Sequence, residues 1–144
     1  MTPPVLRSTL TAFACAAALV FASPSLAAMV NLKAELKASN EVPPNDSKGS
    51  GSLTATYDDA SKKLTWKGST TGMSGPATAA HFHAGETGKN GAVVVPIAGA
   101  DKGAFEGSAT LTDAQAADML GGKWYVNIHT AANKAGELRG QLTK

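Results

Sequence analysis

Apolar and polar residues alternate along most of the chain, in short runs separated by glycine, proline, asparagine and aspartate. Every second residue between positions 30 and 36 is apolar, and the same period recurs at 53–57. Because successive side chains of a strand point to opposite faces, this period predicts half-buried β-strands. The predicted strands are residues 30–36, 53–57, 64–66, 78–83, 93–95, 105–111, 124–129 and 137–142.

One stretch departs from the two-residue period. Thr112 and Gln115 have the spacing of a capping box, in which each side chain accepts a hydrogen bond from the other residue's backbone N–H. Gly121 and Gly122 are expected to end the helix, which therefore covers about residues 112–120. About eight strands with a single short helix predict an all-β domain, either a β-sandwich or a barrel.

The N-terminal residues have the pattern of a secretory signal peptide. Arg7 supplies a positive charge, residues 10–22 are apolar, and small residues precede a cleavage point after Ala27. The apolar run is too short to span a bilayer comfortably, so a membrane anchor is the less favoured interpretation. We therefore expect residues 1–27 to be a signal peptide, residues 28–144 to form one exported domain, and no membrane span after cleavage.

Removal of the signal peptide changes the chemistry available to the protein. Cys15 is the single cysteine of the chain, so cleavage would leave neither a disulfide nor a thiolate metal ligand. The formal net charge of +2 falls by one with the loss of Arg7. A nearly neutral domain without a basic stripe is not expected to bind nucleic acid.

The three histidines of the chain fall on one kind of strand face. His81 and His83 alternate with apolar residues in 78–83, and His129 alternates with apolar residues in 124–129. All three are therefore expected on the outward, polar faces of strands. A His-x-His pair and a third imidazole would supply three neutral nitrogen ligands, which suit copper or zinc, and the affinity order favours copper.

Three further polar residues are expected near these histidines. Asn127 shares the polar face of 124–129, and Glu137 and Arg139 point outward from 137–142. They could orient the imidazoles of a metal site by hydrogen bonding. They could equally hold the histidines in a hydrogen-bond network that contains no metal, or the histidines could simply be polar surface residues.

Several segments resemble the CHRD domain, a family first named from chordin and common in exported bacterial proteins. The resemblance covers essentially all of residues 28–144 and implies an exported protein of the periplasm or the extracellular space. The matching segments, in the family's order, are Asn-Glu-Val-Pro-Pro at 40–44, Ala-His-Phe-His-Ala-Gly at 80–85, Asn-Gly-Ala-Val-Val-Val at 90–95, Tyr-Val-Asn-Ile-His-Thr at 125–130 and Gly-Glu-Leu-Arg-Gly-Gln-Leu at 136–142.

A more distant resemblance connects the chain with copper/zinc superoxide dismutases. The segment 81–83 is similar to their His-x-His ligand pair, 126–131 to their late ligand-bearing strand, and 135–139 to the stretch that carries their guiding arginine. This resemblance implies a Greek-key sandwich with the metal on the outside of the barrel. The bridging histidine, the remaining zinc ligands and the disulfide cysteines of that family are missing here, so it implies at most a mononuclear site.

These observations lead to one preferred function and two alternatives. We expect an exported CHRD-domain protein that binds a transition metal, copper before zinc, through His81, His83 and His129. The first alternative is a non-enzymatic envelope module without metal, which has a structural role or interacts with an envelope or extracellular protein. The second is a redox enzyme similar to superoxide dismutase. The sequence leaves enzymatic activity undecided and favours binding over catalysis.

Overall fold

The computed structural model describes residues 28–144, and the predicted signal peptide, residues 1–27, lies outside the described residues. The described part forms eight strands, one α-helix and two short 3-10 helices. None of the helices in residues 28–144 is long and apolar enough to cross a membrane. The strands are β1 (Met29–Lys37), β2 (Ser50–Asp58), β3 (Lys63–Thr71), β4 (Ala77–Ala84), β5 (Val93–Pro96), β6 (Ala104–Thr110), β7 (Trp124–Thr130) and β8 (Leu138–Gln141); the helices are η1 (Ala38–Asn40), η2 (Ala100–Lys102) and α1 (Asp113–Leu120).

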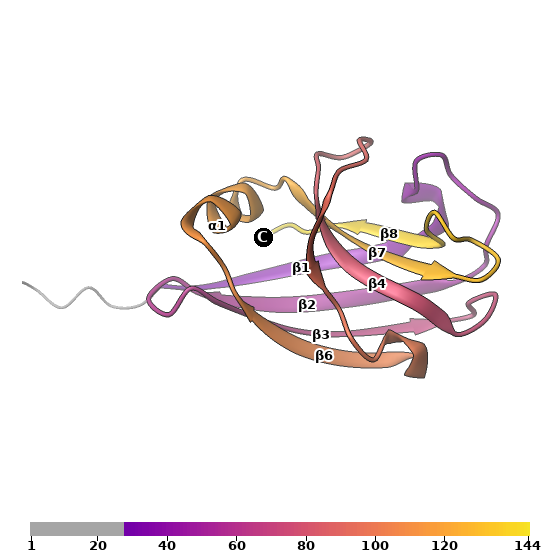
Figure 1. Cartoon of the computed structure of the whole chain (residues 1–144), viewed down its shortest axis with the longest axis horizontal. Coiled ribbons are helices and arrows are strands. Elements are labelled where there is room, and N and C mark those ends of the chain that lie inside the picture. The colour runs from indigo at the N-terminus through magenta and orange to yellow at the C-terminus, as the bar shows by residue number, and fades with distance from the viewer. Residues whose placement is uncertain (1–27) are drawn as a thin grey trace, which may run out of the picture.

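The strands form a single antiparallel sheet that curls into a nearly closed barrel. Their order is β5-β4-β7-β8-β1-β2-β3-β6, so β5 and β6 are its two end strands. Figure 1 shows the two halves of this sheet as layers, with β1, β2, β3 and β6 in one and β4, β7 and β8 in the other. Because β7 returns beside β4, strands β4 to β7 follow a Greek-key order around the barrel. The prediction of an all-β Greek-key domain is confirmed.

The alternating apolar residues of the strands meet inside the barrel. The pairing of β1 with β2 and of β2 with β3 continues without a shift, which keeps every second side chain on the inner face. The ring centroids of Trp66 and Phe82 lie 5.1 Å apart in an edge-to-face contact. The largest fully buried apolar side chains are Trp124, Tyr57, Phe82, Leu36, Leu53, Leu64, Met119, Ile128, Leu138 and Leu142.

The helix α1 lies beside one end of the barrel (Figure 1). Its capping box is formed as predicted: the Thr112 side chain accepts a hydrogen bond from the Gln115 N–H, and the Gln115 side chain accepts one from the Thr112 N–H. Ala116 and Met119 are its buried residues, and Met119 is completely buried. The helix therefore contributes to the core at this end of the barrel and ends before Gly121.

The face of β4, β7 and β8 that points away from the core is less exposed than predicted. We expected His81, His83, His129, Asn127, Glu137 and Arg139 on outward faces, and the alternation does place them opposite the core side chains. That face is not open to solvent, however, because His83, Asn127, Glu137 and Arg139 are all buried. Side chains of β7 and β8 donate hydrogen bonds to the loops at 38–49 and 85–92, which cover this face. Strand periodicity predicts which face a side chain takes, but it carries no information about loops that cover that face.

Candidate metal centre

The three histidines converge on two neighbouring strands. β4 carries His81 and His83, and β7, its direct partner in the sheet, carries His129. His129 pairs with Ala79 in the register, which places it diagonally across from His81. One ring nitrogen from each histidine lies within 4.8 Å of the other two, and His81 Nδ1 is 3.3 Å from His129 Nε2. The structure thus brings together residues that are 48 positions apart in the sequence.

Backbone carbonyls determine which ring nitrogen of two histidines carries the proton. His83 Nδ1 is 2.9 Å from the Gly91 carbonyl oxygen, and His129 Nδ1 is 2.9 Å from the Lys134 carbonyl oxygen. Because a carbonyl oxygen can only accept, each Nδ1 must donate its proton. The neutral rings therefore present Nε2 as an unprotonated lone pair. This is the arrangement in which a histidine commonly binds a metal, with its other ring N–H held by a protein acceptor.

The Nε2 atom of His83 is buried without a hydrogen-bond partner among residues 28–144. Two other buried polar atoms of this region, Tyr57 Oη and Trp66 Nε1, share that condition, but both belong to isolated side chains of the apolar core. The imidazole of His83 instead belongs to a cluster of three histidines, each of which offers one ring nitrogen within 4.8 Å of the others. A buried acceptor left unpaired costs about 1–3 kcal/mol, and a bound cation would remove that cost.

Burial of His81 and His83 favours the neutral form of both imidazoles. Burial, followed by the charges that His129 and His83 would carry, lowers the pKa of His81 below its usual value. Burial also lowers the pKa of His83, and it outweighs the opposing effect of the hydrogen bond to Gly91. Neutral imidazoles are the form that binds metal ions. The lowered pKa values of His81 and His83 thus favour the form that metal binding requires.

The distances allow a common ion after a small adjustment. Nitrogens bound about 2 Å from one metal ion lie no more than about 4 Å apart. Since the donors of His81, His83 and His129 lie within 4.8 Å of one another, an inward movement of about 1 Å brings them into range. His81 and His129 are half-buried whereas His83 is buried, so the open side of the cluster is the side of the first two.

Tyr125 contributes to the site and was not singled out by the sequence analysis. Its ring stacks on His83, with centroids 4.9 Å apart and planes within 10°. Its hydroxyl accepts a hydrogen bond from the Gly91 N–H at 3.0 Å. The alternation in 124–129 could have indicated Tyr125, because it shares the polar face with His129. The two carbonyl acceptors, by contrast, leave no trace in the sequence.

The predicted orienting residues do not hydrogen-bond to the imidazoles. These residues are Asn127, Glu137 and Arg139. Asn127 donates to the Glu41 carboxylate and to the Leu138 carbonyl. Arg139 donates to two loop carbonyls and to the Asn90 side chain. Glu137 is completely buried among hydrogen-bond donors, which are the side chains of Ser47, Ser74, Thr130 and Asn133 and the backbone N–H of Ser74. All three therefore hold loops and turns against β7 and β8, while backbone carbonyls orient His83 and His129.

The two buried glutamates of this region have opposite pKa shifts. Burial raises the pKa of Glu41 to about 7, despite the hydrogen bond from Asn127 and the charge of Arg139. Burial also disfavours the charged form of Glu137, but the hydrogen bonds from Ser47, Ser74 and Thr130 together outweigh it and lower the pKa to about 2. The number of hydrogen bonds to each carboxylate thus decides its charge.

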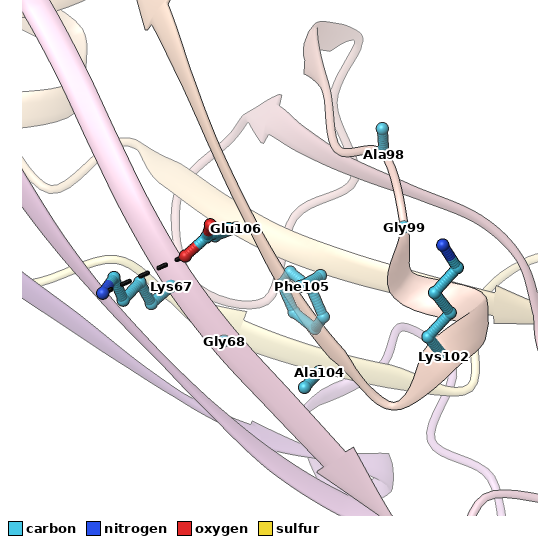
Figure 2. A pocket seen from close by; sticks show the side chains of 8 residues that line it. All are labelled: Lys67, Gly68, Ala98, Gly99, Lys102, Ala104, Phe105 and Glu106. Carbon is cyan, nitrogen blue, oxygen red and sulfur yellow. Dashed lines mark ion pairs between the residues drawn. The ribbon is translucent and has the colours of Figure 1, made fainter.

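A hollow elsewhere on the barrel lacks comparable chemistry. It measures about 700 Å³ and lies between β3, β6 and the segment around η2. Figure 2 shows its lining, in which Lys67 and Glu106 form an exposed ion pair of 3.9 Å and Lys102 extends from the opposite side. Its lining includes no histidine. The histidine cluster therefore remains the candidate functional site.

Comparison with known families gives one match. The sequence model of the CHRD domain matches residues 32–142, a range that begins within β1 and includes all of β2 to β8. No curated protein and no solved structure matches the chain. The matched range includes all three histidines and both loops that cover them.

The Glu137 cluster predicts a loss of stability on isosteric substitution. Glu137→Gln removes the charge that five donors surround, and we expect it to lower the free energy of unfolding by about 2–3 kcal/mol at pH 7. Because the folded-state pKa is the lower one, the contribution of Glu137 is present above pH 4.5 and disappears as the pH falls towards 2. Urea unfolding at pH 7, 4.5 and 3 measures it; a gap between wild type and variant that is constant over this range would contradict the account.

Glu41→Gln is the matched substitution with the opposite expected sign. The folded-state pKa of Glu41 is raised, so its stabilising contribution is present below pH 4.5 and is lost as the pH rises through about 7. At pH 4 the free energy of unfolding of the variant should equal that of wild type. At pH 8 it should be higher than that of wild type by about 1–2 kcal/mol. The same urea titrations measure this difference. Equal destabilisation by both glutamate variants at pH 8 would show that charge is not the cause.

Proposed function

We propose that this chain, which belongs to the CHRD domain family, is an exported protein that binds one copper ion through His81, His83 and His129. A single observation carries the proposal. His83 Nε2 is buried without a hydrogen-bond partner in the described region, on a ring whose Nδ1 bonds to the Gly91 carbonyl, and His83 offers one ring nitrogen within 4.8 Å of one from each of the other two histidines. Export to the periplasm or the extracellular space rests on the signal-peptide pattern of residues 1–27.

The hydrogen bonds favour a metal site over a purely structural histidine network. The sequence suggested a network in which Asn127, Glu137 and Arg139 hold the histidines, but each of these side chains bonds elsewhere. The contact of 3.3 Å between His81 and His129 leaves His83 Nε2 unpaired. A bound cation would pair all three donors at once.

The donor set favours copper over other metals. Three neutral imidazoles without a thiolate suit copper and zinc, and copper(II) binds such nitrogen sites more tightly than zinc does. Hard cations such as magnesium and calcium prefer oxygen ligands, so they are poor candidates for this cluster. Zinc is the main competitor.

The position of the cluster suits binding and exchange of an ion. The half-buried side formed by His81 and His129 leaves an approach from solvent, whereas His83 is anchored against Tyr125 and the loop at 85–92. We propose that the protein carries or buffers the metal in its compartment. The proposal requires no chemical transformation at the site.

Metal titration of the purified protein tests this function. We expect one Cu(II) or Cu(I) per chain, bound more tightly than Zn(II), as measured by calorimetry. Since loss of an orienting partner alone costs about 10–100-fold in metal affinity, loss of a ligand in His83→Ala or His129→Ala should cost more than about 100-fold. Lys134→Ala is the matched control, because it keeps the carbonyl that accepts from His129 and changes only an exposed side chain.

Two outcomes would contradict the proposal. One is the absence of binding at micromolar metal by a protein whose circular dichroism shows the folded barrel. The other is an unchanged stoichiometry and affinity in both histidine variants, which would place the ion elsewhere. Tighter binding of zinc than of copper would retain the site and overturn the assignment of the metal.

A further inference from the structure

The loop between β4 and β5 carries the carbonyl that orients His83. This loop, residues 85–92, has no regular secondary structure, so its shape depends on contacts with the rest of the domain. At its end, the Ala84 N–H donates to the Ala92 carbonyl at 2.9 Å. A Cβ atom at Gly91 would lie 1.5 Å from the Ala84 carbonyl oxygen, so glycine is required by this close approach.

Arg139 holds the middle of this loop. Its guanidinium donates to the Lys89 carbonyl at 2.6 Å, to the Glu86 carbonyl at 3.2 Å and to the Asn90 side chain at 3.0 Å. Arg139 is only 2% exposed and forms no ion pair with the acidic residues of the described region. The three acceptors belong to residues 86–90, which precede Gly91. The buried guanidinium therefore holds the backbone in place as it approaches Gly91.

Arg139 is also linked to the His83 imidazole through the ring of Tyr125. Its guanidinium carbon lies 3.5 Å from the centroid of the Tyr125 ring, and that ring stacks on His83. Since β7 lies between β4 and β8 in the sheet, Tyr125 lies between His83 and Arg139. The Tyr125 hydroxyl in turn accepts from the Gly91 N–H. The loop and the stacked rings therefore join Arg139 to the same imidazole by two routes.

We propose that Arg139 is the positioning residue of the metal centre, which holds the loop at 85–92 so that the Gly91 carbonyl keeps the proton of His83 on Nδ1. The significance of this role for metal binding rests on the proposed function, whereas the tautomer itself is a property of the metal-free protein. Lysine cannot replace arginine here, because an ammonium group lacks the planar fork that reaches several acceptors and stacks on a ring.

Nitrogen-15 NMR of the histidine side chains in the metal-free protein tests the proposal. At a pH where the rings are neutral, we expect wild-type His83 to show the Nδ1–H tautomer alone. In Arg139→Lys the signals of His83 should shift towards a mixture of tautomers. His129 is the internal control, because its tautomer depends on the Lys134 carbonyl in another loop and should not change. Lys89→Ala is the matched loop control, since it removes an exposed side chain and its surface ion pair with Glu86 but keeps the carbonyl that accepts from Arg139, and it should leave His83 unchanged.

Copper titration of the same variants provides the second measurement. If the tautomer matters for binding, Arg139→Lys should lower copper affinity by about 10–100-fold while Lys89→Ala does not. A His83 tautomer identical in wild type and in Arg139→Lys would overturn the inference, whatever the metal titration gives. Failure of wild type to bind copper, with the tautomer shifted in the variant, would overturn the proposed function and leave the positioning role standing.

Asn90→Ala keeps the proposal testable if Arg139→Lys does not fold. Asn90 is exposed, accepts a hydrogen bond from Arg139 and donates one to the Val42 carbonyl at 2.9 Å. Its removal weakens the attachment of the loop without leaving a buried charge unpaired. A shift confined to His83 would support the proposal. Unchanged signals of His83 in a folded Asn90→Ala protein would count against it.

Discussion

The antiparallel pairing of β4 with β7 is the interaction on which the rest of the structure depends. It runs from Ala84 opposite Trp124 to Ala77 opposite Thr130, and it places Phe82 and Val126 on the core face. The same register necessarily places the three histidines together on the other face. A slip of one residue would bury the histidines in the core and expose its aromatic rings. Formation of the core and assembly of the site are therefore one event.

The second face of this strand pair is closed by loops, and its polar groups need partners. Glu137 gathers hydroxyl, amide and backbone donors from three segments, and Arg139 supplies donors to the loop at 85–92. Each buried charge is thereby compensated by hydrogen bonds instead of by an opposite charge. His83 Nε2 is the buried atom of this histidine cluster that has no hydrogen-bond partner among residues 28–144. That contrast supports the proposal that the cluster binds a cation.

The sequence predicted the elements well because their signals are local. Alternation located all eight strands, and the spacing of Thr112 and Gln115 located the helix. The same alternation put the three histidines on a common face. It could not predict that the face is covered, because the covering loops reach β7 and β8 through contacts between residues far apart in the chain, such as Asn45 with Glu137. Nor could it predict that the carbonyls of Gly91 and Lys134 accept hydrogen bonds from His83 and His129, since a backbone carbonyl is present at every position.

X-ray absorption spectroscopy of the copper-loaded protein tests the central claim most directly. A copper ion held by the three histidines should show a shell of three imidazole nitrogens at about 2.0 Å, with the multiple scattering that imidazole rings produce. One imidazole should disappear from this shell in His83→Ala. A shell dominated by oxygen ligands, or an imidazole count unaffected by that substitution, would contradict a copper site built from His81, His83 and His129.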